Sequence, residues 1–249
     1  MMTRGGNSCP VRSAQAGVHP GLLTLLARRR DHDWQRALRP APAWWPRVAA
    51  LLDAGRGLQL DLGCGTGAST AALAASQPET LVLGIDASID RLTRGPGRVG
   101  QPSATVDASA PAHASSTVLR ASGCAQIAAN GWLLHGDSVD LVQRLATIRD
   151  LRISRCWLLY PNPWPKPAQL ARRWYAHPVF PQLLALSTEM ELRCNWRPFA
   201  EDFVAATRWL GRDAVLRSLP ADLTPLTLFE RKYRASGHAL WQVDVRSMA

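Results

Sequence analysis

Acidic and glycine residues cluster where a short apolar run of the sequence ends. Residues 58–62 form that run, and Asp61 within it is followed by Gly63, Gly65 and Gly67. Glycines at spacings of two allow a tight turn and let the backbone approach a flat ligand, because no Cβ intervenes. The dinucleotide fingerprint spaces its glycines two and three apart and faces a diphosphate, which the acid here disfavours. The segment indicates a nucleoside-binding turn, with a purely structural glycine turn as the alternative.

Two more aspartates follow later apolar runs. Asp86 closes residues 81–86, about 20 residues after the glycine turn, where a carboxylate can accept hydrogen bonds from both hydroxyls of a ribose. Asp137 follows the run at residues 132–135 and can accept from an adenine amino group. Each acid has a structural alternative, because aspartate also caps helices, and Ser88 competes with Asp86 for that role. Three acids at successive run ends favour a nucleoside pocket.

A proline-rich loop carries the second group of chemically suited residues. Residues 160–167 read Tyr-Pro-Asn-Pro-Trp-Pro-Lys-Pro, and the alternating prolines fix φ and remove backbone donors. A stiff, extended loop of this kind can hold the Asn162 amide, the Trp164 ring and the Lys166 ammonium at fixed places. Arg172 and Arg173 follow, and their guanidinium groups suit phosphate. For these two arginines the alternative is an ordinary exposed helix face.

These residues need a framework that brings the ends of several runs together. Apolar runs alternate with helical patterns, which predicts an α/β fold with an open, mostly parallel sheet, helices on both faces and one late antiparallel strand. Ligands bind at the carboxyl ends of the strands in such sheets. Strands are expected at residues 58–62, 81–86, 132–135, 153–160, 190–194, 214–219 and 239–245. Helices are expected at residues 22–30, 43–52, 68–76, 126–130, 138–147, 169–174, 179–186 and 198–210.

Composition divides the chain into an arm and a domain. Residues 1–40 mix Gly, Pro, Ser and arginine without sustained periodicity, so we expect a basic, largely disordered arm with one short helix. Residues 41–249 form the expected domain. Within it, residues 95–122 hold too few large apolar side chains to pack, and they predict a solvated insertion.

Charge and cysteine content narrow the class of partner. The 249 residues carry 29 Lys and Arg against 19 Asp and Glu, a net charge of +10. This field suits a polyanion, although genomic base composition can produce the same arginine bias. Five cysteines without a Cys-x-x-Cys pair predict neither a disulfide framework nor a zinc site. No run approaches the ~18 apolar residues of a membrane span, so we expect a cytoplasmic protein without a membrane partner. No metal partner is expected either, and the choice between monomer and homodimer is left open.

Taken together, these segments resemble known methyltransferases. The acid-x-Gly-x-Gly-x-Gly turn resembles motif I of the S-adenosylmethionine-dependent enzymes. The proline loop and a late segment at residues 227–233 resemble the bacterial tRNA (guanine-N7)-methyltransferase family, over residues 58–241. The resemblance implies a Rossmann-like methyltransferase fold, S-adenosyl-L-methionine as cofactor and tRNA as partner. It implies cofactor binding by Asp61, Gly63, Gly65, Gly67, Asp86, Asp137 and Asn162.

The same resemblance implies substrate roles. Asn162 would be the catalytic residue, facing both the cofactor and the target base. Contacts to RNA or guanosine are implied for Lys166, Arg172, Arg173, Asn195, Thr227 and Glu230. Guanine N7 carries a lone pair and no proton, so catalysis would rest on positioning. Asn195 has the alternative of capping the next helix, and Thr227 and Glu230 that of a plain hairpin loop.

The sequence departs from the family at three positions. Family aspartates are replaced by Asn162 and Asn195, and a family lysine by Leu228. A neutral amide accepts from guanine more weakly than a carboxylate does. Two other functions therefore remain open. One is a methyltransferase that acts on an exocyclic amine through Asn162, Pro163 and Trp164, and the other is an RNA-binding protein that has lost turnover.

Overall fold

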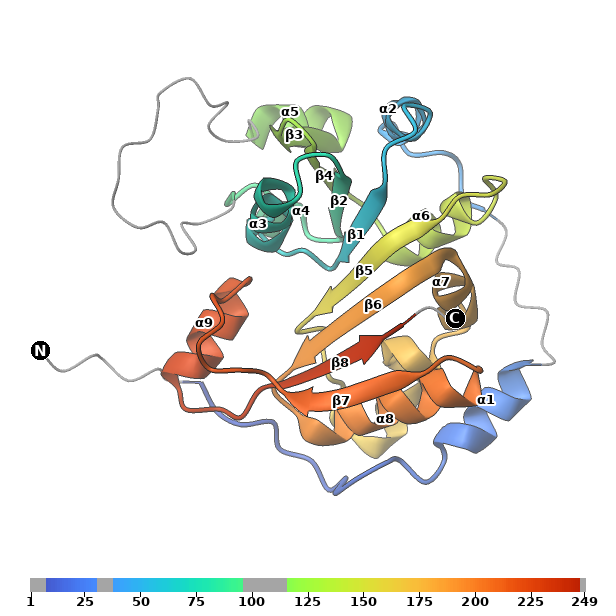
Figure 1. Ribbon diagram of the computed structural model, residues 1–249, viewed down its shortest axis with the longest axis vertical. Coiled ribbons are helices and arrows are strands. Elements are labelled where there is room, and N and C mark those ends of the chain that lie inside the picture. The colour runs from blue at the N-terminus through green and yellow to red at the C-terminus, as the bar shows by residue number, and fades with distance from the viewer. Residues whose placement is uncertain (1–7, 31–37, 96–115, 247–249) are drawn as a thin grey trace, which may run out of the picture. The chain divides into compact units, whose positions relative to one another are not determined.

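The computed structural model describes residues 8–30, 38–95 and 116–246, which fall into two compact units (Figure 1). The glycine-loop unit comprises residues 38–157 and 224–228. The proline-loop unit comprises residues 158–223, residues from 229 onward and the N-terminal segment up to residue 37. The division therefore differs from the arm and single domain expected from composition, because residues 8–30 belong to a unit built mainly from the C-terminal part of the chain.

The glycine-loop unit is built on strands in the order β3-β4-β2-β1-β5. Strand β1 pairs in parallel with β2 and β5, and β2 pairs in parallel with β4, whereas β3 runs antiparallel to β4. Its elements are α2 (Trp45–Leu52), β1 (Leu58–Leu62), α3 (Ala68–Ser76), β2 (Leu81–Asp86), α4 (Ile89–Leu92), α5 (Ser116–Ser122), β3 (Cys124–Ala128), β4 (Gly131–His135), α6 (Ser138–Leu145) and β5 (Ile153–Leu159).

The central strands of this unit are buried along their whole length. Every residue of β1 and β2 is buried, as expected for parallel strands that are covered on both faces. Helix α3 lies close to β2, because a Cβ added at Gly84 would come within 2.2 Å of the Thr70 hydroxyl. Glycine on the strand therefore lets the helix that follows the glycine turn pack tightly against the sheet.

The proline-loop unit contains the strands β6-β8-β7, and β8 runs antiparallel to both neighbours. Its elements are α1 (Leu22–Arg30), the 3-10 turns η1 (Pro167–Arg172) and η2 (Trp174–Ala176), α7 (Phe180–Leu186), β6 (Ser187–Cys194), α8 (Arg197–Trp209), β7 (Ala214–Ser218), α9 (Leu228–Ala235) and β8 (Trp241–Val245). Phe203 of α8 packs edge-on against Tyr175 and Phe180, with ring centroids 6.2 and 5.2 Å apart. These buried aromatic rings form the core of the unit.

The predicted α/β fold with an open, mostly parallel sheet is confirmed, and β8 is the late antiparallel strand. The helix predicted at residues 126–130 is wrong, because these residues fall largely in the edge strand β3 and the turn that follows it. Five residues with a single large apolar side chain, Ile127, carry too little periodicity to tell a helix from a strand, so pairing with β4 decides. Helix α9 was not predicted, and residues 167–172 form a 3-10 turn instead of a regular helix.

Two low-complexity segments hold more structure than their composition indicates. The short helix expected near the N-terminus is α1, whose Leu22 and Leu26 are buried, and it contacts α8. Residues 8–30 thus depart from the expected disorder, whereas residues 1–7 and 31–37 lie outside the described part. In the expected insertion, residues 116–122 form α5 with Leu119 buried, and residues 96–115 lie outside the described part. Among the described helices, none has the length and apolar character needed to span a membrane.

Candidate functional site

The glycine turn after β1 adopts a left-handed backbone at all three glycines. The φ angles are 77° at Gly63, 62° at Gly65 and 80° at Gly67, a region that favours glycine. A Cβ added at Gly67 would lie 2.6 Å from Leu133, so this position packs against β4. Cβ atoms added at Gly63 and Gly65 would meet no atom of the described residues within 4 Å. The first two glycines therefore leave an open cradle, as a ligand-binding turn requires.

Asp61 is buried beside this turn with one oxygen unsatisfied. Its Oδ2 accepts hydrogen bonds from the Ser69 and Thr70 hydroxyls at 2.6 and 2.7 Å. Its Oδ1 is buried without a hydrogen-bond partner among the described residues. The pKa of this carboxyl is raised to about 6, mainly because the carboxyl is buried. The two hydroxyl hydrogen bonds lower the pKa, and the nearby charge of Asp86 raises it. A buried acceptor that lacks a donor fits a ligand that brings an N–H or O–H group.

Asp86 ties the glycine turn to the end of β2. Its Oδ2 accepts from the Gly65 backbone N–H at 2.9 Å, and its Oδ1 accepts from the Ser88 N–H at 2.8 Å. Arg91 pairs with Oδ1 at 2.9 Å. The cap of α4 is Ser88, whose hydroxyl accepts from the Arg91 N–H. Ser88, and not Asp86, is therefore the N-cap of α4, and Asp86 instead stabilises the glycine turn through the Gly65 N–H.

Asp137 occupies the N-cap of α6. Its Oδ1 accepts from the Val139 N–H at 2.9 Å, and its backbone is extended, as is usual for a cap. The alternative that Asp137 caps the following helix is therefore confirmed. Helix α6 begins where β4 ends, so Asp137 also lies at the carboxyl end of a strand that neighbours β2, as the sequence predicts.

The proline loop contains two bulky residues with a left-handed backbone. The φ angles are 55° at Tyr160 and 44° at Trp164, which for aromatic residues cost about 1–3 kcal/mol each. Asn162 and Lys166 are exposed on this loop, and the Asn162 Oδ1 accepts from the Trp164 N–H at 3.3 Å. Prolines alone do not impose a positive φ, so surrounding contacts must hold this conformation.

The two adjacent arginines have opposite surroundings. Arg172 is exposed, and its guanidinium lies 4.9 Å from the centre of the Trp164 ring. Arg173 is 0% exposed and pairs with Asp202 at 2.8 Å. The prediction that Arg173 contacts RNA is therefore wrong, because its charge is neutralised inside the unit. Arg172 keeps the exposure that its predicted role needs.

The remaining predicted substrate residues are Asn195, which follows β6, Thr227, which precedes α9 in the sequence, and Glu230 within α9. Asn195 bonds His238 at 3.2 Å and caps no helix, since α8 has Trp196 at its N-cap. Thr227 is 8% exposed and directly precedes α9, and Glu230 is fully buried within α9. The hairpin-loop alternative is therefore wrong for Glu230, which lies in a helix, whereas Thr227 does lie in the irregular part of the connection between the antiparallel strands β7 and β8.

The carboxylate of Glu230 is committed to protein partners. It accepts from Arg193 at 3.1 Å and from Arg234 at 2.8 Å. In this arrangement Glu230 supports the two arginines, and the predicted guanosine contact would require it to leave them. A residue-type match could not show this, because Arg193 is supplied by β6 and Arg234 faces Glu230 only when residues 228–235 form a helix.

An aromatic group beside Asn195 was not identified from the sequence. The ring centroids of Tyr160 and Tyr233 are 5.5 Å apart, and Tyr233 stacks on His238 at 5.2 Å with an interplanar angle of 17°. Phe229 is 46% exposed and stacks on Tyr233 at 6.1 Å. The only signal in the sequence is that aromatic residues recur in the late segment. Exposed and half-buried rings of this kind can stack on a base.

The fold and the glycine turn define a Rossmann-like methyltransferase. The chain belongs to the Methyltransf_4 family, described as putative methyltransferase, which matches residues 56–243. A solved 16S rRNA methyltransferase, KamB, has the same fold, with a TM-score of 0.52 and 16% identity over 82% of this chain and 94% of that chain.

Several relatives are named tRNA (guanine-N(7)-)-methyltransferase. The protein from Burkholderia cenocepacia is 27% identical over 199 residues, which cover 76% of this chain and 67% of that protein. The protein from Sodalis glossinidius is 26% identical over 208 residues, covering 79% and 74%. The protein from Zymomonas mobilis is 30% identical over 128 residues, and the match spans only 52% of its length.

Membership of this family implies S-adenosylmethionine as the methyl donor. The residues of the glycine-loop unit fit such a nucleoside. Asp61 offers an unsatisfied buried oxygen, the turn at Gly63 and Gly65 is open, and Asp86 stands at the adjacent strand end. The sequence indicated the two acids and the glycine turn, whereas the unsatisfied oxygen of Asp61 is visible only in the structure.

Proposed function

We propose that this protein transfers a methyl group from S-adenosylmethionine to guanine N7 of tRNA. The observation that carries the proposal is the proline loop, which presents the exposed Asn162 amide between two residues with a strained backbone. Relatives of this chain are named tRNA (guanine-N(7)-)-methyltransferase, which supports the choice of base and RNA. Strain at a solvent-exposed loop is typical of functional sites. The open glycine turn and the unsatisfied Asp61 oxygen support the cofactor half of the proposal.

The glycine-loop unit would hold the cofactor. Asp61, with its Oδ1 ionised, would accept a hydrogen bond from the cofactor, and Asp86 would keep the turn open while it accepts from a ribose hydroxyl. Gly63 and Gly65 would admit the ligand against the backbone. When bound, S-adenosylmethionine supplies an electrophilic methyl carbon on a positively charged sulfur.

The proline-loop unit would orient the base. The Asn162 amide oxygen would accept from a base N–H, and the N7 lone pair needs no general base because it carries no proton. Holding the nitrogen in line would therefore supply most of the acceleration. Lys166 and Arg172, both exposed, would contact RNA phosphates, which makes binding fall with salt.

Methyl transfer to unmodified tRNA tests the proposal directly. Wild-type protein, tRNA and labelled donor should give labelled tRNA with one site that breaks on reduction and aniline treatment, as N7-methylguanine does. Asn162→Ala should lower turnover by 10-fold or more and weaken cofactor binding by a smaller factor, because Asp61 and Asp86 would still hold the cofactor. Absence of label in every RNA tested would overturn the proposal.

Methylation of an exocyclic amine is a second candidate. Its support is the neutral, exposed Asn162 amide, which can accept from an amino group without charge. The Trp164 ring would have to stack on the base in that mechanism, yet Arg172 lies over one of its faces. An aniline-resistant methylated product would favour this candidate over N7 transfer.

Loss of turnover is the remaining alternative, and Asn162 and Asn195 motivate it. Asn162→Asp restores the family residue on the loop and distinguishes the cases. If the wild-type chain binds tRNA without methylating it and Asn162→Asp gains activity, the protein is an RNA-binding relative that has lost catalysis. Turnover by the wild-type chain would dispose of this reading.

A further inference from the structure

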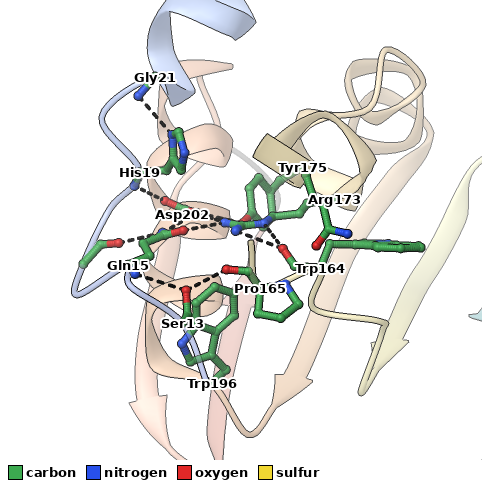
Figure 2. Close-up of polar contacts among 12 residues, drawn as sticks. Ser13, Gln15, His19, Gly21, Trp164, Pro165, Arg173, Tyr175, Trp196 and Asp202 are labelled. Carbon is green, nitrogen blue, oxygen red and sulfur yellow. Dashed lines mark hydrogen bonds and ion pairs between the residues drawn. The ribbon is translucent and has the colours of Figure 1, made fainter. Parts of the chain in front are cut away.

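Arg173 and Asp202 form a fully buried ion pair in the proline-loop unit (Figure 2). Besides Arg173, the Asp202 carboxylate accepts from the Tyr175 hydroxyl at 2.8 Å, the Gln15 amide at 2.9 Å and the His19 backbone N–H at 2.6 Å. Four donors on one buried carboxylate compensate its loss of hydration. The charge of Arg173 is thus held in one place.

The same guanidinium holds the proline loop. The Nε and one terminal nitrogen of Arg173 donate to the Trp164 carbonyl oxygen at 3.2 and 3.1 Å, as Figure 2 shows. The N–H of Trp164 in turn donates to Asn162 Oδ1. Trp164 is one of the two loop residues with a left-handed backbone, a conformation that persists only where surrounding contacts impose it. One residue therefore links the buried cation to the exposed Asn162 side chain.

The N-terminal strap, residues 13–19, completes this support. The Ser13 hydroxyl donates to the Pro165 carbonyl oxygen at 2.6 Å, and the Gln15 side-chain oxygen accepts from Arg173 at 2.9 Å (Figure 2). The Arg173 guanidinium also lies 5.0 Å from the centre of the Trp196 ring. The strap thus contacts both the loop and the cation that holds the loop.

We propose that Arg173 is a positioning residue for methyl transfer, which acts through the Trp164 carbonyl to fix the loop that presents Asn162, with the N-terminal strap as its support. The inference rests on the proposed function. It assigns Arg173 a role that needs no contact with RNA, and it assigns Ser13 and Gln15 a role in maintaining the conformation of the proline loop.

Arg173→Lys is the test variant, because lysine keeps a cation opposite Asp202 but lacks the planar fork that grips Trp164. Arg212→Lys is the matched control. Arg212 also donates to backbone carbonyl oxygens, those of Leu184 and Ser187. These contacts lie at the start of β6, whereas the proline loop lies at the end of β6, where the Tyr160 N–H donates to the Arg193 carbonyl oxygen.

Turnover, cofactor affinity and melting temperature are measured for both variants. Arg173→Lys should lower kcat by 10-fold or more with the cofactor Kd within twofold of wild type. Arg212→Lys should lower the melting temperature and leave kcat within twofold. Wild-type kcat in Arg173→Lys, or an equal loss in both variants, would overturn the positioning role. Ser13→Ala, which spares the ion pair, and Gln15→Ala, which removes one hydrogen bond from each of its two members, should lower kcat two- to fivefold. No loss in Ser13→Ala would remove the strap from the proposal.

Amide hydrogen exchange of residues 160–169 separates this inference from the proposed function. Exchange should be faster in Arg173→Lys than in wild type and unchanged in Arg212→Lys, whether or not methyl transfer is detected. Faster exchange in a chain that methylates no RNA would overturn the function and leave the loop clamp in place. Unchanged exchange in Arg173→Lys would overturn the clamp itself.

Discussion

The glycine turn and the proline loop both use left-handed backbone, but they reach it by different routes. In the turn, Gly63, Gly65 and Gly67 adopt it at little steric cost. In the loop, Tyr160 and Trp164 adopt it against the preference of bulky residues, and Arg173 grips the Trp164 carbonyl. The comparison shows that the conformation of a glycine turn is determined by its own residues, whereas the conformation of a strained loop depends on contacts from residues outside it.

The largest expected effect is on the stability of the glycine turn. Gly67→Ala places a Cβ against Leu133 at a positive φ, and we expect a loss of about 3 kcal/mol in the free energy of unfolding. The control Gly55→Ala has the same backbone region, but no atom in the described part of the chain lies within 4 Å of the added Cβ, and it should cost about 1 kcal/mol. Equal losses in denaturant titrations would show that contact with Leu133 does not matter.

The next effect is on cofactor binding. Asp86→Ala removes the acceptor for the Gly65 N–H and should weaken S-adenosylmethionine binding by about 100-fold, or about 2.7 kcal/mol, in calorimetry. Asp90→Ala is the control, because Asp90 is 75% exposed and pairs with Arg120 on the surface. An unchanged affinity in Asp86→Ala would separate the turn from cofactor binding.

Asp61→Asn should move affinity and stability in opposite directions. The pKa of Asp61 is raised to about 6, so the folded chain binds this proton more tightly than the unfolded chain, and the charged form is destabilising above that pH. We expect the variant to gain on the order of 1 kcal/mol of stability at pH 7 and to lose cofactor affinity 10-fold or more.

The pH dependence supplies the check on this residue. Cofactor affinity of the wild type should fall as the pH drops through about 6, as the carboxyl gains its proton, and the stability advantage of Asp61→Asn should shrink over the same range. Affinity that is flat between pH 5 and 7 would contradict a direct role for the charge.

The smallest effect concerns the arginine beside the loop. Arg172→Ala should weaken tRNA binding two- to threefold and reduce the slope of log K against log salt by about 1, as expected for one phosphate contact. Arg173→Lys should leave that slope unchanged, because its charge is buried against Asp202. A lower slope in Arg173→Lys would mean that this residue reaches RNA after all.

Local pattern was sufficient wherever the signal lay within one element and its neighbours. The apolar runs at β1 and β2 and the glycine spacing after β1 predict the strands, the turn and the positions of Asp61 and Asp86. Buried parallel strands need continuous apolar residues, and a turn with positive φ needs glycine, so both are visible in the sequence. The edge strand β3 carries neither signal, and the sequence pattern places its last three residues, 126–128, in a helix.

By itself, the sequence determined the α/β fold, the open glycine turn and the acids at its strand ends, because each depends on residue type and short spacing. Only the tertiary structure decided that Arg172 is exposed while Arg173 is buried, that Glu230 is held by two arginines, and that the N-terminal strap supports the proline loop. The physical reason is that a charged side chain takes its role from the partners that long-range folding brings to it. For Arg173 these are Asp202, Gln15 and the Trp164 carbonyl.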